Sequence, residues 1–290
     1  MNWRRAKNLL LISFLLLDLM LAWLYVGLRA ETRGHAAGVG VEPEILAQLA
    51  DNNITLSTEL PRGTPELAVL KVGLKRQNPY PLALTFFGSL EEVKMVRLDD
   101  PLLIAAFSRG REELLFYSSG VTVYTCPGPA DPAGSSQSKA EAEQRAREFL
   151  AKHGGLDELQ LLRSVPYRRQ GTFLVEFTQS WQGRPLVGAS GAVLVVTPAG
   201  VENCWRRYLT VFGESGIRRS VIPAEAALLA LALERSRPQA TPLTVKEITL
   251  GYYNKIYNAD EWEAAPVWRI WTGGDTYFYI NAFTGELEAL

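Results

Sequence analysis

The residue types that most often carry out catalysis are scarce in this chain. Its 290 residues include two histidines, His35 in a polar, glycine-rich stretch and His153 at the end of a predicted helix. A cation at that helix end would suit the helix dipole. Neither histidine has a neighbouring nucleophile or metal-ligand spacing, and no G-x-S-x-G, H-E-x-x-H, Walker A or G-x-G-x-x-G motif occurs. We therefore expect no enzymatic activity, no metal and no cofactor.

Two smaller groups of residues leave alternatives open. Cys126 and Cys204 could pair in an exported domain, or remain free buried thiols. Asp260, Glu261 and Glu263 form an acidic cluster that suggests calcium. The cluster lacks the regular oxygen spacing and the glycine of a calcium loop, which favours a solvated loop.

Aromatic residues are dense near the end of the chain. They either pack in the cores of small sheets or form an exposed surface for a partner or ligand. The residues concerned are Tyr252, Tyr253, Tyr257, Trp262, Trp268, Trp271, Tyr277, Phe278 and Tyr279.

One apolar stretch near the N-terminus is long enough to cross a membrane. Residues 9–28 (LLLISFLLLDLMLAWLYVGL) would reach about 30 Å as a helix, the thickness of a bilayer's hydrocarbon core. Arg4, Arg5 and Lys7 precede it, which favours a cytoplasmic N-terminus and an extracytoplasmic body. Because the run is longer than a signal-peptide core and no clean cleavage site follows, we expect an uncleaved anchor.

The predicted anchor contains the candidate contact residues. Asp18 lies at its middle, where a carboxylate costs about 2.5–3.5 kcal/mol. Asp18 either hydrogen-bonds another transmembrane helix or is tolerated by a very apolar helix as a protonated or hydrated acid. Trp23 and Tyr25 suit the interfacial belt near the outer face.

The charge balance excludes one class of partner. The chain has 30 basic and 31 acidic residues, and residues 1–28 hold three basic residues and one acidic residue. The remaining body therefore carries 27 basic against 30 acidic residues, a net charge of −3. A surface of that balance gives no reason to expect binding to nucleic acid.

Composition and turn residues divide the chain into segments. We predict a cytoplasmic arm (1–8), the transmembrane anchor (9–28), a stalk (29–41), an N-terminal α+β domain (42–126), a linker (127–137) and two similar units (138–213 and 214–290).

The last two segments share one order of elements. Ser138 and Glu141 form a capping box before a helix, and Pro223 begins a second helix. Strands and tight turns follow each helix, among them the strands 201–212 and 244–253 and the turn Gly273-Gly274-Asp275. The fold class is therefore α+β, with tandem units in which a helix covers an antiparallel sheet.

Both ends of the chain resemble a known family. The opening MNWRRAKNLLLISFLLLDLML is similar to the start of the YycI family, with Trp3, Arg5, Ala6 and Lys7 before a single anchor. The ending PVWRIWTGGDTYFYINAFTGEL resembles the C-terminus of that family and also a PepSY-type unit. The residues that carry this second resemblance are Val267, Trp268, Ile270, Tyr279, Ile280, Asn281, Ala282, Thr284, Gly285 and Glu286.

The resemblance implies a regulatory role. YycI-like proteins are accessory membrane proteins of Gram-positive bacteria that act with a related protein, YycH, on the sensor histidine kinase WalK (YycG), which controls cell-wall metabolism. The contact would involve transmembrane helices and extracytoplasmic domains, with Asp18 in the helix contact. We expect a single-pass cell-membrane protein that modulates a WalK-like kinase.

Three other functions remain open from the sequence. PepSY-like units by themselves would also fit a membrane-tethered inhibitor or chaperone of an exported peptidase. An extracytoplasmic ligand sensor would have an apolar pocket between the repeats, lined by the aromatic residues. A tethered wall hydrolase would need two carboxylates about 5–10 Å apart in a cleft.

Overall fold

A computed structural model describes the folded body of the chain. The described residues are 43–96, 100–128, 136–155, 159–235, 241–255, 259–274 and 276–288. The predicted arm, anchor and stalk lie outside these ranges. Within them, no helix combines the length and the apolar character needed to cross a membrane.

The fold is α+β and consists mostly of sheet. The helices of the described residues are α2 (Pro43–Asp51), α3 (Pro79–Phe87), α4 (Lys139–Lys152) and α5 (Ala224–Glu234). The first strands are β1 (Ile54–Leu56), β2 (Glu66–Leu74), β3 (Lys94–Met95), β4 (Leu103–Arg109), β5 (Glu112–Tyr117) and β6 (Thr122–Thr125). After α4 come β7 (Leu159–Pro166), β8 (Phe173–Trp181), β9 (Arg184–Gly188), β10 (Gly191–Thr197), β11 (Gly200–Arg207) and β12 (Leu209–Ser220). After α5 come β13 (Leu243–Val245), β14 (Glu247–Asn254), β15 (Glu261–Gly273) and β16 (Thr276–Asn281).

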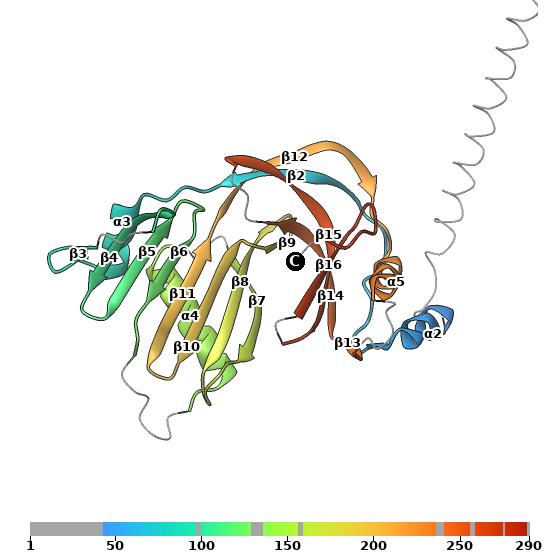
Figure 1. The fold of residues 1–290 in the computed structure, drawn as a ribbon, viewed down its shortest axis with the longest axis horizontal. Coiled ribbons are helices and arrows are strands. Elements are labelled where there is room, and N and C mark those ends of the chain that lie inside the picture. Colours follow the sequence, from blue (N-terminus) through green and yellow to red (C-terminus); the bar gives the residue numbers. More distant parts are fainter. Residues whose placement is uncertain are drawn as a thin grey trace, which may run out of the picture. The chain divides into compact units, whose positions relative to one another are not determined.

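Most strands join one long, curved sheet (Figure 1). Its first half has the order β7-β8-β10-β11-β6-β5-β4-β3, and its second half contains β14, β15, β16, β2 and β12. Strand β9 connects the halves, because it pairs antiparallel with the end of β8 and parallel with β14. A separate two-stranded sheet pairs β1 with β13 in parallel.

Helix α4 covers one face of the first half. The capping box predicted at its start is confirmed: the Ser138 hydroxyl accepts from the Glu141 N–H, and Glu141 accepts from the Ser138 N–H. Ala142, Ala146 and Leu150 form its buried face. They pack with alternate residues of the strands beneath, among them Val175, Phe177, Ala192, Leu194 and Cys204.

Helix α3 adds to the same core. The side chain of Asn78 accepts from the Tyr80 N–H at the start of the helix, and Gly88 ends it with a φ of 75°. Phe86 and Phe87 are buried against the α4 core. Two aromatic residues thus fix α3, although its sequence has weak helical periodicity.

The second half of the sheet has its own helix. Helix α5 follows Pro223 as predicted, buries Ala224, Ala227, Leu228 and Leu231, and packs against β16. The Trp268 indole N–H donates to the Ile222 carbonyl oxygen at 2.9 Å, which ties β15 to the segment before the helix.

Two strands differ from their predicted extent. Residues 201–212 form two strands, β11 and β12, interrupted at Tyr208, and β12 continues to Ser220. The predicted strand 244–253 is divided between β13 and β14, because its two parts pair with different partners.

Strand pairing crosses the predicted segment boundaries. Strand β6 pairs with β11, and β2 lies between β12 and β15. Strands from residues 42–126 therefore complete both halves of the sheet. The division into domains stays a prediction.

Removing the cap of α4 should lower stability. We expect Ser138→Ala to reduce the free energy of unfolding by about 1 kcal/mol, because the Glu141 N–H loses its acceptor. Urea unfolding followed by tryptophan fluorescence would measure this. Ser136→Ala, a change at an exposed serine two residues earlier, is the control and should leave the midpoint unchanged. Equal midpoints for both variants would contradict the capping role.

His153 lies at the end of α4 as predicted, but its surroundings disfavour the cation that would suit the helix dipole there. Its side chain is buried, with the Phe86 and Phe149 rings each 4.4 Å from the imidazole centre. Nδ1 lies 3.1 Å from the Thr85 carbonyl oxygen, so the neutral ring donates from Nδ1. Burial lowers the pKa of His153, with smaller contributions from nearby charges, because the apolar surroundings disfavour imidazolium.

This burial predicts a pH dependence of stability. The unfolded chain binds a proton at His153 near pH 6.5, whereas the folded chain binds it at lower pH. The free energy of unfolding should therefore fall as the pH is lowered from about 6.5, and His153 should contribute no dependence above that value. Urea unfolding between pH 5 and pH 8 would test this. His153→Gln keeps a donor for Thr85, and an unchanged pH profile in that variant would contradict the assignment.

Candidate functional site

The residues predicted to contact a partner are not among those that the structure describes. Asp18, Trp23 and Tyr25 all lie in residues 1–42. Their roles stay predictions. The site is therefore described from the surfaces of the folded body and from its joints, by which we mean polar side chains that connect separate strands.

The structure places the two cysteines and the residues of the acidic cluster. Cys126 and Cys204 are free, and Cys204 is buried, which raises its pKa to about 12. The acids take separate cationic or hydroxyl partners: Asp260 pairs with Arg76, Glu261 with Lys71, and Glu263 accepts from Ser215. No cluster of three metal-ligating side chains occurs within the described ranges.

The C-terminal motif forms a structural turn. Asn281 accepts from the N–H groups of Phe283 and Thr284 through its side chain, and from the Gly285 N–H through its backbone. The Thr284 hydroxyl donates to Glu286 at 3.1 Å, and Gly285 has a φ of 78°. These residue types are thus explained by the geometry of a tight turn.

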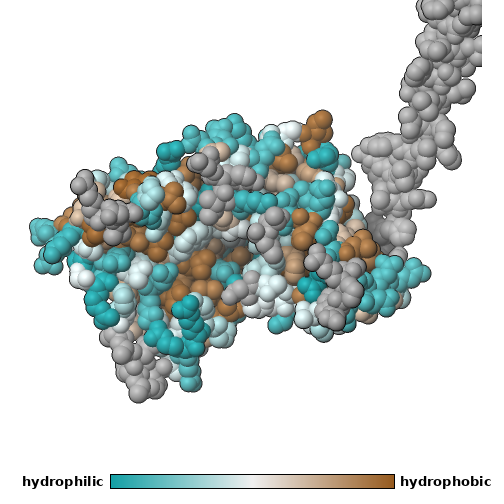
Figure 2. Space-filling model, in the orientation of Figure 1, coloured by the Kyte–Doolittle hydropathy of each residue, from teal (hydrophilic) through white to brown (hydrophobic). Residues whose placement is uncertain are grey.

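A strip of apolar side chains runs across the sheet face opposite α4, here called the inner face. Leu115, Val123, Trp205 and Val193 are aligned in register across β5, β6, β11 and β10. All four are half-buried. Figure 2 shows hydrophobic residues gathered over β8, β10 and β11 on this face. The side chains of this strip are therefore neither core residues nor fully exposed.

An arginine connects the inner face to the second half of the sheet. Arg163 in β7 makes two 2.7 Å hydrogen bonds to the Glu176 carboxylate in β8. Its remaining nitrogen, Nη1, donates to the Gly274 carbonyl oxygen at 2.6 Å, and its guanidinium lies 4.9 Å from the Tyr277 ring centre. One side chain thus joins the β7–β8 hairpin to the β15–β16 hairpin.

Tyrosine rings continue from this contact along the second half. The Tyr277 ring also contacts Arg269, which is buried and pairs with Glu247 at 2.9 Å. Tyr253 and Tyr279 stack with their ring centres 4.6 Å apart. Burial raises the pKa of Tyr279 to about 12, so the ring stays neutral and acts as packing surface.

Two further polar joints fix the sheet. Arg207 is 1% exposed and donates to the carbonyl oxygens of Ser119 and Ala189, and its guanidinium lies over the Trp262 ring. Burial lowers its pKa. The Gln179 side chain donates to the Leu209 carbonyl oxygen at 2.9 Å and accepts from the Leu209 N–H at 2.8 Å.

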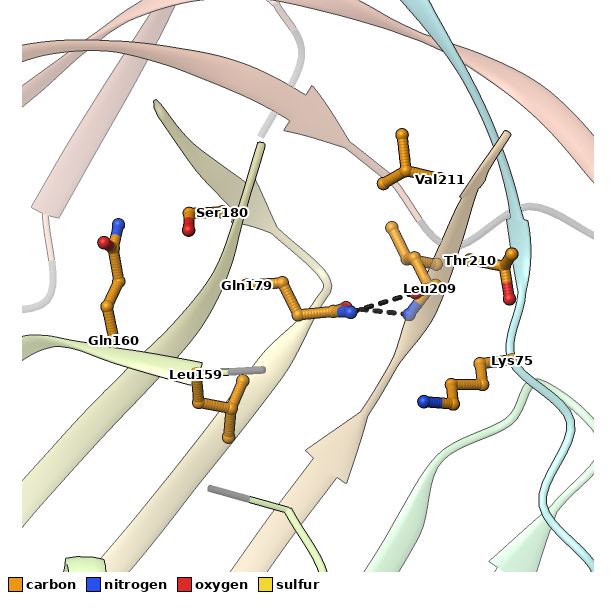
Figure 3. A pocket seen from close by; sticks show the side chains of 8 residues that line it. All are labelled: Lys75, Leu159, Gln160, Gln179, Ser180, Leu209, Thr210 and Val211. Carbon is orange, nitrogen blue, oxygen red and sulfur yellow. Dashed lines mark hydrogen bonds between the residues drawn. The ribbon is translucent and has the colours of Figure 1, made fainter. Parts of the chain in front are cut away.

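A cavity of about 540 Å³ surrounds the Gln179 joint. Figure 3 shows Gln179 reaching to Leu209, with Lys75, Gln160 and Ser180 around it. The lining residues include a lysine, amides and hydroxyls, but no carboxylate, histidine or cysteine. The described lining thus offers no pair of acid and base for general acid–base catalysis. We interpret this cavity as a recess at the joint between strands.

Comparison with known proteins identifies the family. The model of the YycI protein family matches residues 120–283, which is more than half of the chain. The chain belongs to the YycI family. This family consists of regulatory accessory proteins and is not known for enzymes. The matched residues include the inner-face strands β8, β10 and β11, and the Arg163, Gln179 and Arg207 joints.

Solved structures show related folds at low sequence identity. A crystal structure of an uncharacterized protein from Eubacterium rectale is similar, with a TM-score of 0.58 and 11% identity, covering 87% of this chain and all of the other. The C-terminal domain of YpeB from Bacillus megaterium gives a TM-score of 0.40 and 14% identity, covering 72% of this chain and 93% of that one. No match was found among curated proteins. The first comparison supports the fold of this YycI-family chain.

The polar joints were missed by the sequence reasoning. Arg163 interrupts the apolar run LQLLRSV, which gives a local indication of a polar role. Nothing near it in the sequence points to Gly274 or Tyr277, which are more than 100 residues away. Of the aromatic residues between 252 and 279, Tyr252 and Trp268 are core residues, whereas Tyr277 is a contact between hairpins.

The Arg163 contact should contribute strongly to stability. Arg163→Met should lower the free energy of unfolding by about 3 kcal/mol, because the largely buried Glu176 carboxylate loses its partner. Arg163→Met combined with Glu176→Leu should be more stable than Arg163→Met, since no unpaired charge remains. A double-mutant cycle by urea unfolding measures this. Additive effects of the two substitutions would show that the pair is not coupled.

Proposed function

We propose that this YycI-family protein is a non-enzymatic, membrane-anchored accessory protein that modulates a sensor histidine kinase of the WalK type. The observation that carries the proposal is the family match over residues 120–283. The apolar run 9–28 supports a single-pass anchor with a cytoplasmic N-terminus and an extracytoplasmic body. The kinase system would control cell-wall metabolism.

Contact with the kinase would occur at two levels. Within the membrane, Asp18 would hydrogen-bond a kinase helix, with Trp23 and Tyr25 at the interface. Outside it, the apolar strip of Leu115, Val123, Trp205 and Val193 offers a surface for the kinase or for a YycH-like partner. We further propose that α4 and α5, with the strands that follow them, are tandem PepSY-like units.

The mechanism would be a shift in the population of kinase states. A kinase with two signalling states responds to a bound protein that has higher affinity for one of them. A coupling free energy of roughly 1–3 kcal/mol changes the ratio of the states 5- to 150-fold. A rigid body joined by Arg163, Gln179 and Arg207 would transmit such a preference without a catalytic step.

Co-purification with an exchanged anchor would test the proposal. The full-length protein and a variant with an unrelated apolar helix in place of residues 9–28 would be crosslinked in native membranes. Recovery of a sensor histidine kinase that depends on the native helix is the expected result. Recovery of an exported peptidase with either anchor would instead indicate a PepSY-type inhibitor or chaperone.

A single substitution tests the contact within the membrane. Asp18→Leu should strengthen membrane insertion, because the acid is costly at the bilayer centre, and should weaken association with the kinase. A membrane two-hybrid assay measures the association, and Leu16→Ile is a conservative control in the same run. Unchanged association of Asp18→Leu would reject a role for the carboxylate.

A further inference from the structure

Helix α3 is attached to the sheet by few contacts, although it shares a core with α4. The chain leaves β2 at Leu74, forms α3, and returns to the sheet at the two-residue edge strand β3. Figure 1 shows α3 beside β4 at the end of the first half. The chain between β2 and β4 supplies no central strand, so its release would leave the other strand pairings in place. A nine-residue helix does not persist in water without its packing partners.

One imidazole fastens α3 to the end of α4. The His153 ring lies nearly parallel to the Phe86 ring, with an interplanar angle of 15° and ring centres 4.4 Å apart. Its Nδ1 lies 3.1 Å from the carbonyl oxygen of Thr85, in the last turn of α3. Among the described residues, that oxygen is the ring's one hydrogen-bond partner. The neutral ring uses its single N–H in this bond, whereas an imidazolium would have a second N–H without an acceptor.

Two cations lie near the ring. The Arg206 guanidinium of β11 donates to the His153 backbone carbonyl oxygen at 2.8 Å, and it lies 4.8 Å from the centre of the Phe86 ring. Lys152 precedes His153 at the end of α4. A proton on the imidazole would add a third positive charge at a side chain that is 5% exposed. Repulsion between like charges and the loss of hydration both disfavour that state.

The carboxylate that faces the ring is already bonded to other residues. Glu112 of β5 accepts two hydrogen bonds from Arg109, at 2.8 and 3.1 Å, and one from the Tyr124 hydroxyl at 2.8 Å. The Tyr124 ring lies 6.4 Å from the imidazole centre, and burial, together with Glu112, raises the pKa of Tyr124, so this ring stays neutral. An imidazolium at His153 would therefore lack a counterion of its own.

These contacts make the attachment of α3 depend on the charge of one ring. Once α3 is released, the imidazole is hydrated and takes up a proton without these costs. We infer that α3 is a pH-sensitive latch: in mild acid, protonation of His153 releases residues 75–93 from the sheet and uncovers the aromatic side chains beneath. Among these are Tyr124 and Phe149, whose ring centres lie 5.2 and 6.0 Å from that of Phe86. This switch goes beyond the proposed regulatory function and does not depend on it.

Hydrogen–deuterium exchange of the full-length protein, in detergent because of its apolar run 9–28, would measure the latch. Peptides covering α3 would be compared at pH 7.5 and pH 5.0 after correction for intrinsic exchange rates, with α5 as an internal reference. A group of pKa 6.5 that binds its proton only in the released state raises the opening constant about 30-fold between these pH values. We expect α3 to lose protection about 10- to 30-fold, while α5 keeps its protection.

Two substitutions and a control assign the response to His153. His153→Gln keeps a donor for the Thr85 carbonyl oxygen, and His153→Phe keeps a ring against Phe86. Neither side chain takes up a proton, so α3 should have equal protection at both pH values in each variant. His35→Gln removes the other histidine of the chain and should keep the full response. Thermal unfolding at pH 7.5 checks that each variant is folded, and either folded His153 variant is sufficient.

Three outcomes would overturn the latch. Equal protection of α3 at both pH values in the unmodified protein would show that acid does not release it. A loss of protection that persists in a folded His153 variant would assign the response to another group. Loss of protection in α3 and α5 together would show unfolding of the whole body instead of release of one helix. None of these measurements involves the kinase, so failure here is distinct from failure of the proposed regulatory function.

Discussion

The contact between Arg163 and the β15–β16 hairpin is the constraint on which the arrangement of the sheet depends. The two halves share a continuous network of strands, but β9 connects them through a few residues of β8 and β14. A connection of that length would permit the sheet to bend. Arg163 limits the bending because its guanidinium is held in one orientation by Glu176 while it binds Gly274 and Tyr277. The planar guanidinium suits such a role, since its fixed donors point in several directions at once.

The Arg163 contact also bears on which part of the inner face is left uncovered. Helices α4 and α3 cover one face of the first half, so its alternate residues must point to the inner face. The Arg163 contact occupies the inner face at β7 and β8, whereas the strip across β10, β11, β6 and β5 stays half-buried. The Arg163 contact and the apolar strip thus share one face of the sheet.

This arrangement agrees with membership of a family of accessory proteins. The residues that match the YycI model form a scaffold whose buried polar side chains are used mainly to connect strands: Arg163 with Glu176, Gln179 with the backbone of Leu209, and Arg207 with two carbonyl oxygens. The C-terminal Asn281–Glu286 motif likewise forms a turn. The buried polar side chains among the matched residues thus connect elements of the fold.

The sequence by itself indicated several local features of the structure and the resemblance to the family. The capping box at Ser138, the proline before α5, the hairpin turns and the terminal motifs are all encoded by residues close together in the chain. It also indicated the α+β class, because segments with helical patterns are followed by segments with strand-like patterns.

Only the tertiary structure decided that β2 inserts between β12 and β15, that β9 joins the halves, and that Arg163 reaches Tyr277. The physical reason is that backbone hydrogen bonds between strands are chemically alike for every pair. The choice among distant partners therefore depends on how all the side chains pack together, which no local pattern of residues contains.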